Sequence, residues 1–151
     1  MIYSLSKYIL SIVLPEDFAQ NVGLENDKTI NIGGEGSYLD SISFEYEKDM
    51  FSTKADTTGS WVHDKTLAAN GTVKISLHQL SPQIDKFKKI VNLYRQSGVN
   101  YDGLQIGLKD SESNEIMSAQ DCFFTQIPTQ SFKSESETQE WSLTCGKITT
   151  I

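Results

Sequence analysis

Alternation of apolar and polar residues with a period of two is the feature that most constrains how this chain can fold. Between residues 72 and 79, valine, isoleucine and leucine occupy one set of alternate positions, while threonine, lysine, serine and histidine occupy the other. Residues 41–47 repeat the pattern. Side chains of a strand point alternately to its two faces. Both segments are therefore predicted to be half-buried β-strands.

Further extended segments surround these two strands. Residues 8–14 form an apolar run, but Pro15 and two acidic residues follow directly without a small-residue cleavage site, so we interpret the run as an edge or partly buried strand rather than a signal peptide. Residues 104–109 and 115–125 flank a polar turn and predict a hairpin. The other extended segments are residues 29–32, 50–55, 131–135 and 138–144.

One helix is predicted, over about residues 82–96. Ser81 can cap its first turn, and Pro82 suits the first helical position because its missing N–H is not needed there. Gly98 is a typical terminating residue. Apolar residues recur at helical spacing at Ile84, Phe87, Val91 and Tyr94. This stripe should pack against a sheet.

The 151 residues fit a single domain, residues 1–151, with one core. A series of strands with a single helix predicts a mainly β, α+β fold, either a β-sandwich or a partly closed barrel with a flanking helix. Gly59 is expected to form a turn and Trp61 to plug the core. Trp141, in the last predicted strand, shares one face with Leu143.

The acidic composition narrows the possible partners. The sequence carries 13 basic and 20 acidic side chains, a formal charge of −7, without a cluster of lysine and arginine. Tight binding to phosphate backbones is therefore not expected, whereas an acidic surface would repel DNA that slides past it. No run approaches the roughly 20 apolar residues of a membrane span. Cys122 and Cys145 match neither a disulfide framework nor a CxxC site, and we expect buried free thiols.

Two short motifs resemble ligand-binding loops but miss required positions. The glycine-rich residues 33–36 follow an extended segment, yet Leu39 stands where a dinucleotide-binding loop needs its third glycine. Residues 110–114 have the alternating oxygen ligands of a calcium loop, yet Glu115 occupies the position that requires glycine. Both are interpreted as turns between strands.

The sequence contains no recognisable catalytic motif. His63 and His78 lie in no metal-binding or nucleophile motif. Glu45 and Glu47 share a strand face, but charged outer faces of strands are usually solvated. We therefore expect a protein that is not an enzyme and has no cofactor.

Taken in order, these features form a longer pattern. An aspartate, a glycine and an aromatic residue precede a polar loop, and the next strand ends in Leu-x-Gln-x-Ser-Pro and leads into the helix. The residues concerned are Asp56, Gly59, Trp61, Leu77, Gln79, Ser81 and Pro82, with Trp141 near the end. The pattern resembles small phage tail tube proteins of the myophage and Mu-like type and, more distantly, tube proteins of type VI secretion systems and tailocins. The resemblance spans roughly residues 37–145.

The resemblance implies a protein that assembles with copies of itself. Protomers would form hexameric rings by joining their sheets edge to edge, and the rings would stack into a hollow tube. DNA would pass through the lumen without specific binding. The implied partners are the tail sheath, tape measure and baseplate proteins, with no membrane. The implied location is the virion tail, assembled in the cytoplasm of the bacterial host.

Two surfaces of such a tube can be assigned as hypotheses. Acidic residues that would line the lumen and repel DNA are Asp40, Glu45, Glu47 and Asp49. The polar loop of residues 64–70, including Asp64, Lys65 and Asn70, is expected to contact the next ring, because loops tolerate extension and carry contacts.

Two alternative functions remain open on sequence grounds. A type VI secretion or tailocin tube would share the fold and the rings without carrying DNA. A monomeric carbohydrate-binding β-sandwich would use exposed Trp61, Trp141 or Tyr46 as a stacking platform, although their placement among apolar partners favours core packing.

Overall fold

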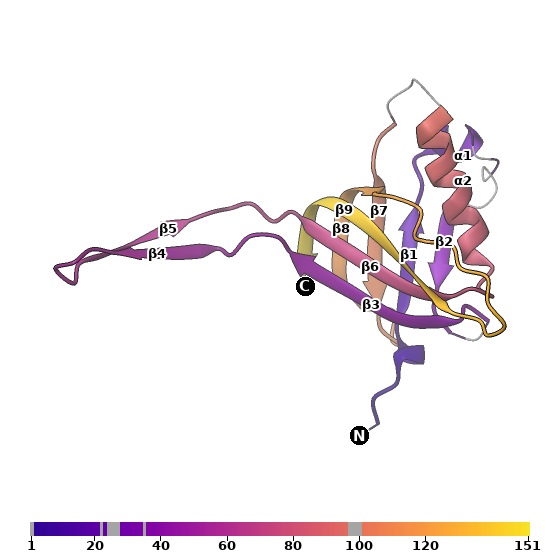
Figure 1. Ribbon diagram of the computed structural model, residues 1–151, viewed down its shortest axis with the longest axis horizontal. Helices are drawn as coiled ribbons and strands as arrows, with labels where there is room; N and C mark the ends of the chain where they lie inside the picture. Colours follow the sequence, from indigo (N-terminus) through magenta and orange to yellow (C-terminus); the bar gives the residue numbers. More distant parts are fainter. Residues whose placement is uncertain (1, 22, 24–27, 35, 97–100) are drawn as a thin grey trace.

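The computed structural model describes residues 2–21, 23, 28–34, 36–96 and 101–151. Its main feature is a seven-stranded sheet in which every neighbouring pair is antiparallel. In sheet order the strands are β2 (Thr29–Ile32), β1 (Ile9–Val13), β7 (Leu104–Lys109), β8 (Glu115–Phe124), β9 (Thr138–Thr150), β6 (Gly71–His78) and β3 (Leu39–Tyr46). The sheet curls into a partly closed barrel, as Figure 1 shows. The predicted mainly β fold with a flanking helix is confirmed.

The long strand β9 links two parts of the curled sheet. Its first half pairs with β6, from Thr138 opposite His78 to Cys145 opposite Gly71. Its second half pairs with β8, so that Cys145 also lies opposite Cys122. Both thiols are buried and free, as the sequence predicted. The hydrogen bond with Cys145 and, to a smaller extent, burial raise the pKa of the Cys122 thiol.

Helix α2 (Gln83–Gln96) covers one face of the sheet. Its buried residues are Ile84, Phe87, Ile90 and Val91. The Phe87 ring lies 5.5 Å from the Trp141 ring of β9 and 4.9 Å from the Phe124 ring of β8. Strand β6 presents alternate buried residues to the same core. The apolar residues that recur about every 3.6 positions in α2 and at every second position in β6 therefore pack together in one apolar layer.

The start of α2 differs from the sequence prediction. The helix begins at Gln83, and Pro82 lies in the preceding turn. The Ser81 carbonyl accepts a hydrogen bond from the Ile84 N–H at 3.3 Å, but its hydroxyl has no hydrogen-bond partner among the described residues. Ser81 therefore starts the helix through its backbone and not as a side-chain cap. The predicted terminator Gly98 lies outside the described residues.

The first forty residues contain more structure than the sequence indicated. A short 3-10 turn, η1 (Leu5–Lys7), precedes β1, and helix α1 (Glu16–Asn21) follows it. Phe18 of α1 is fully buried, with its ring centre 5.2 Å from that of Tyr94 and 4.9 Å from that of Tyr101. Strand β1 lies between β2 and β7, so it is an internal strand and not an edge.

Two further sequence predictions were wrong. Trp61 does not plug the core, because 66% of its surface is exposed on a hairpin formed by β4 (Phe51–Ala55) and β5 (Trp61–Lys65). Residues 131–135 form no strand but belong to an irregular loop between β8 and β9. A tryptophan in an alternating segment is usually buried, but here its segment pairs outside the main sheet.

The two tryptophans provide a matched test of this fold. We expect Trp141→Ala to lower the free energy of unfolding by about 3–5 kcal/mol, because it leaves a large cavity beside Phe87. Trp61→Ala should change the stability of the isolated protomer by no more than about 0.5 kcal/mol, because the side chain is exposed. Urea unfolding measures both. A large loss in Trp61→Ala would contradict its placement outside the core.

Candidate functional site

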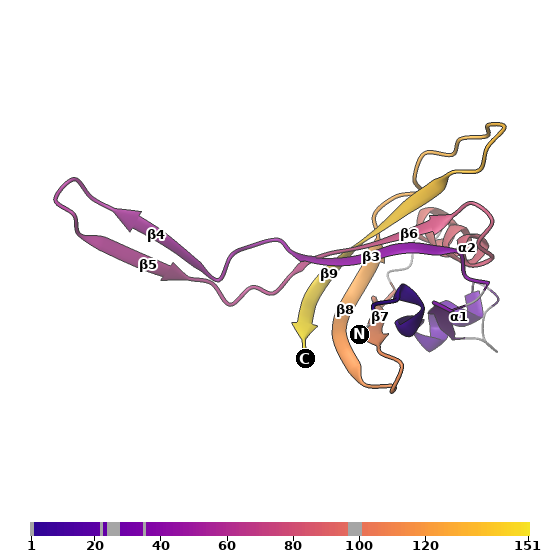
Figure 2. The same ribbon diagram turned by 90° about the horizontal axis from the view of Figure 1, so that it is seen from below.

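Residues 47–70 leave the main sheet between β3 and β6 and form an arm. Its strands β4 and β5 pair only with each other and extend away from the body, as Figure 1 and Figure 2 show. Every residue of both strands is exposed. The arm therefore contributes nothing to the apolar core of its own chain.

The tip of the arm is an ordered turn built on one carboxylate. Asp56 accepts hydrogen bonds from the Thr58 hydroxyl at 2.7 Å, the Thr58 N–H at 2.9 Å and the Ser60 N–H at 3.0 Å. These bonds lower the pKa of Asp56, with the Thr58 hydroxyl contributing most. Gly59 has a φ of 89°, which confirms the predicted turn and explains the glycine.

The side chains of the arm make only exposed contacts. Thr53 Oγ1 lies 2.8 Å from His63 Nδ1, and Lys54 Nζ lies 3.6 Å from Asp64 Oδ2. Exposed pairs of this kind contribute little, and an isolated two-stranded ribbon is marginally stable in water. Large exposed apolar residues in the arm are Met50, Phe51, Trp61, Val62 and Leu67. Packing against another molecule would bury this apolar surface and stabilise the ribbon.

A groove of about 560 Å³ lies where the arm joins the sheet. We call it the root groove, and its apolar lining comes mainly from Tyr46, Met50, Leu67, Ala68, Ala69 and Ile148. Three lysines also line it, Lys48, Lys65 and Lys147, against one aspartate, Asp49. The groove thus combines an apolar lining with an excess of positive charge.

The predicted inter-ring residues do not share one loop, and only Lys65 of the three lines the root groove. Asp64 and Lys65 belong to β5, so the prediction of a loop over residues 64–70 is wrong for its first two residues. Asn70 precedes β6, where its carbonyl accepts a hydrogen bond from the Glu47 N–H at 3.0 Å and its amide donates to the Glu47 carboxylate. The arm is therefore joined to the body by paired chain segments.

The predicted lumen residues are all exposed but do not form one cluster. Glu45 lies on β3, on the face opposite to the half-buried Ile42 and Phe44. Asp40 lies where the pairing of β3 with β6 shifts register, and Asp49 lines the root groove. All four carboxylates are at the surface, and their place in a lumen stays a prediction.

The face of the sheet that α2 does not cover is rich in hydroxyl groups. Across β3, β6 and β9 the cross-strand rows are Ser41–Ser76–Glu140, Ser43–Lys74–Ser142 and Glu45–Thr72–Thr144. Serine and threonine thus outnumber charged residues, and the charges comprise two glutamates and one lysine. We call this surface the open face. Sequence reasoning missed it because it depends on strand order and register.

The two histidines of the described part of the chain lie beside hydroxyl groups, and no metal-binding cluster is found there. No group of three or more histidine, cysteine, aspartate or glutamate side chains there could hold a metal ion. His63 Nδ1 lies 2.8 Å from the Thr53 hydroxyl on the arm, and His78 Nε2 lies 3.4 Å from the Ser136 hydroxyl, and both contacts are exposed. Among the described residues, no helix is long and apolar enough to cross a membrane.

The sequence matches the family model of the bacteriophage PhiTE tail tube protein over residues 25–151. The chain belongs to this family. The match confirms the resemblance inferred from the strand, turn and helix pattern, and it makes the chain a structural tail tube protein. A comparison with curated proteins finds no significant match.

Solved structures of injection particles share the fold of this tail tube protein. A chain of the PVC sheath–tube complex of an extracellular contractile injection system, in its extended state, is 13% identical, with 99% of this chain and 93% of that chain covered and a TM-score of 0.54. A chain of the anti-feeding prophage tube-terminating cap is 15% identical, with coverage of 99% and 91% and a TM-score of 0.53. A chain of the anti-feeding prophage baseplate is 9% identical, with coverage of 100% and 96% and a TM-score of 0.55.

The turn at the arm tip can be tested independently of assembly. We expect Asp56→Ala to speed hydrogen exchange of the β4 and β5 amides without lowering the melting temperature of the body, because the carboxylate holds only the tip. Folding lowers the pKa of Asp56 below its ordinary value of 3.8, so the ionised carboxylate stabilises the tip fully above pH 3.8. This stabilisation is lost as the pH falls through the lowered pKa of the folded state.

A matched control is the turn between β7 and β8. Asp110 accepts hydrogen bonds from the Glu112 and Asn114 N–H groups in the same manner, but its turn joins two strands of the main sheet. Asp110→Ala should affect exchange in β7 and β8 and leave the arm unchanged. Equal exchange rates in the arm of the wild type and of Asp56→Ala would contradict the role of the carboxylate.

Proposed function

We propose that this tail tube protein forms hexameric rings that stack into a hollow tube through which DNA passes during ejection. The observation that carries the proposal is the arm, a ribbon that exposes large apolar side chains and makes no contribution to its own core. Such a ribbon is stabilised by packing on another copy. Family membership supports the tube, and the six-fold symmetrised anti-feeding prophage baseplate supports six copies in each ring.

Ring closure would use the edges of the main sheet. β3 and β2 are the first and last strands of that sheet, so each has one side on which main-chain groups can pair with another chain. Joining sheets edge to edge around a six-fold axis satisfies these groups and leaves no free edge. Rigid backbone pairing also suits a tube that must keep a constant bore.

The open face is the surface best suited to line the lumen. α2 covers the opposite face, which leaves the hydroxyl rows of β3, β6 and β9 available to a channel. Hydroxyl groups and the carboxylates Glu45 and Glu140 offer DNA few cationic partners, so a sliding phosphate backbone is not held. Glu47 continues the same strand side, while Asp40 and Asp49 would extend the acidic surface toward the two ends of β3.

The arm would carry the contact between rings. It extends beyond the body, and its exposed residues Phe51 and Trp61 lie on the same face of the ribbon as their partners Lys65 and Ala55. Burying two aromatic side chains on an adjacent ring would supply the apolar area that the ribbon lacks. Asp64 and Lys65 on β5, with Asn70 at the root, would form the polar rim of this contact.

The remaining partners follow from the assembly. The PVC structure contains a sheath–tube complex and the anti-feeding prophage structures a cap and a baseplate, which supports sheath, terminator and baseplate proteins as partners here and a contractile tail. A tape measure protein would set the tube length. Assembly would take place in the cytoplasm of the bacterial host.

The chain would act as a structural subunit and not as an enzyme, with no cofactor.

A second candidate is the tube of a phage-derived injection particle that carries no DNA. The fold shared with the extracellular contractile injection system and the anti-feeding prophage favours it as an alternative. The nucleic acid content of purified particles distinguishes the two, because only a phage tail leads to a DNA-filled head.

Removing the arm tests stacking. Replacing residues 50–66 by a short glycine–serine linker should leave the seven-stranded body and its rings intact, because no side chain of β4 or β5 is buried. We expect rings that do not elongate in electron micrographs. Shortening the β7–β8 turn at residues 111–113 is the control and should leave tube length unchanged. Long tubes from the arm-deleted chain would refute the inter-ring role.

Charge reversal tests the lumen assignment. Glu45→Lys with Glu47→Lys should leave tubes intact but slow DNA release, because lysines attract the phosphates that the carboxylates repel. The matched control is Glu112→Lys with Glu115→Lys, which moves the net charge equally at the β7–β8 hairpin. Ejection kinetics of the assembled phage give the readout. Normal release from the Glu45 and Glu47 double variant would place these residues outside the lumen.

A further inference from the structure

Phe132 is a large apolar residue held at the surface of the body. It lies in the loop of residues 125–137 between β8 and β9, and 89% of its surface is exposed. This loop lies at the end of the sheet farthest from the arm, as both Figure 1 and Figure 2 show. An exposed phenylalanine of this kind marks a contact with another molecule when the surrounding chain is ordered.

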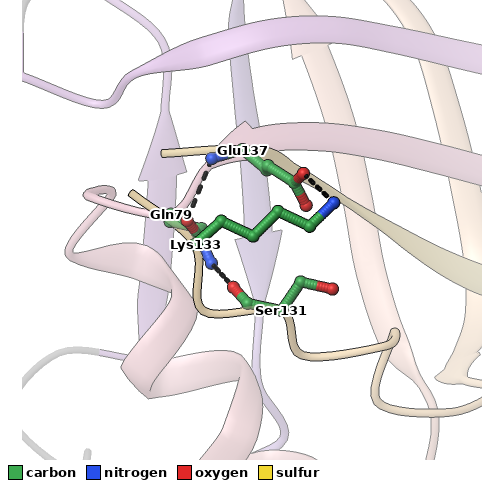
Figure 3. A network of polar contacts seen from close by, with 4 residues as sticks. All are labelled: Gln79, Ser131, Lys133 and Glu137. Carbon is green, nitrogen blue, oxygen red and sulfur yellow. Dashed lines mark hydrogen bonds and ion pairs between the residues drawn. The ribbon is translucent and has the colours of Figure 1, made fainter. Parts of the chain in front are cut away.

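Polar contacts hold both neighbours of Phe132 in the chain, Ser131 and Lys133, which Figure 3 shows together with Gln79 and Glu137. On one side, the Gln79 side-chain amide donates to the Ser131 carbonyl at 2.5 Å. On the other, Lys133 Nζ lies 2.9 Å from Glu137 Oε1, and the Glu137 N–H donates to Gln79 Oε1 at 2.9 Å. These bonds hold the loop to Gln79 at the end of β6. Phe132 therefore lies in an ordered segment before any partner binds. Pre-organisation lowers the entropy lost when such a residue docks.

The root groove lies at the other end of the same strand. The groove adjoins Gly71, where β6 begins, and the Phe132 loop leads into Thr138, which pairs with His78 at the end of β6. The eight residues of β6 thus separate the protruding phenylalanine from the apolar groove by about 25 Å. A protrusion at one end and a complementary groove at the other cannot meet within one copy. Between copies such surfaces can form a head-to-tail contact, which builds an open filament when successive copies do not close into a ring.

The charges around the two surfaces are also complementary. The root groove has three lysines and one aspartate, although the chain as a whole carries a net charge of −7. The loop of residues 125–137, which holds Phe132, contains two glutamates, Glu135 and Glu137, and one lysine, Lys133, which pairs with Glu137. Glu135 is exposed in this loop, and Lys147 is exposed at the groove. Opposite charges around an apolar anchor fix the register of a contact.

We infer that Phe132 of one copy inserts into the root groove of a copy in the next ring, with Glu135 facing Lys147 across the contact. The inference rests on the proposed stacking of rings and names the two surfaces that meet. Each ring presents the groove and the arm at one end and the Phe132 loop at the other. The tube consequently has a direction, and every added ring offers the same groove to the next.

Photocrosslinking locates the occupant of the groove directly. A photoreactive phenylalanine analogue replaces Phe132 in the full chain, assembled tubes are irradiated, and mass spectrometry identifies the attached peptide. The expected crosslinks are to residues 66–69 or 148–150 of another copy. Crosslinks to any other segment, or to a sheath protein added to the tubes, would overturn the inference.

The length of the tubes formed by variants tests the Phe132 contact separately from the proposed function. We expect Phe132→Ala to form rings but to weaken their stacking by at least about tenfold, the effect of losing an anchor residue. Leu80→Ala is the matched control, because Leu80 is another exposed apolar residue at the same end of the sheet, and its tubes should keep their length. Lys147→Glu and Glu135→Lys should each shorten tubes, and the double variant should restore them.

The outcomes are distinguishable. If the wild type forms neither rings nor tubes, the proposed function fails, and the inference fails with it. If the wild type forms tubes and those of Phe132→Ala are equally long, only the inference fails. Equal shortening by Leu80→Ala and Phe132→Ala, or a charge-reversed pair no better than its single variants, would also overturn it.

Discussion

The structure depends on the pairing of β6 with β3 on one side and β9 on the other. Because the side chains of β6 alternate, one set packs with Trp141 and α2 in the core, while the other set forms the hydroxyl rows of the open face. The two ends of the same strand carry the assembly surfaces. The arm enters β6 at Gly71, and the Phe132 loop is tied to Gln79, one residue beyond its end. The strand β6 thus contributes side chains to the core and to the open face, and its two ends adjoin the two contact surfaces.

Stability and assembly use different parts of the chain. The body buries its apolar residues in one layer between the sheet and α2, whereas the arm leaves its aromatic residues exposed. A monomeric protein would gain little from a marginally stable ribbon of this kind. In the proposed tube the same ribbon would pack against another copy, and its exposed apolar side chains would hold the assembly together. The carbohydrate-binding alternative loses Trp141 as a platform because that residue is buried, whereas Trp61 and Tyr46 are exposed. The family match, and not the burial of these aromatic residues, favours the tail tube over this alternative.

Local patterns predicted the elements whose burial follows from the sequence alone. The alternation in β6 and β3, the apolar stripe of α2 and the turn between β7 and β8 all satisfy local rules and were confirmed. The prediction that Trp61 lies in the core was wrong, because a large apolar residue type indicates burial but not whether its own chain or another molecule buries it. The root groove and the open face were missed because they depend on strand order and register. Phe132 gave no local signal, since a single phenylalanine in a polar segment reveals neither its exposure nor the contacts that hold its loop.

We propose that this tail tube protein assembles with itself through surfaces already present in the free protomer. The most direct test is negative-stain electron microscopy of the purified wild-type protein, together with its mass in solution over a range of concentrations. Rings with six-fold end views that elongate into hollow tubes, and a mass that rises with concentration, are the expected results. A strict monomer at high concentration, with no rings on the grid, would contradict the claim.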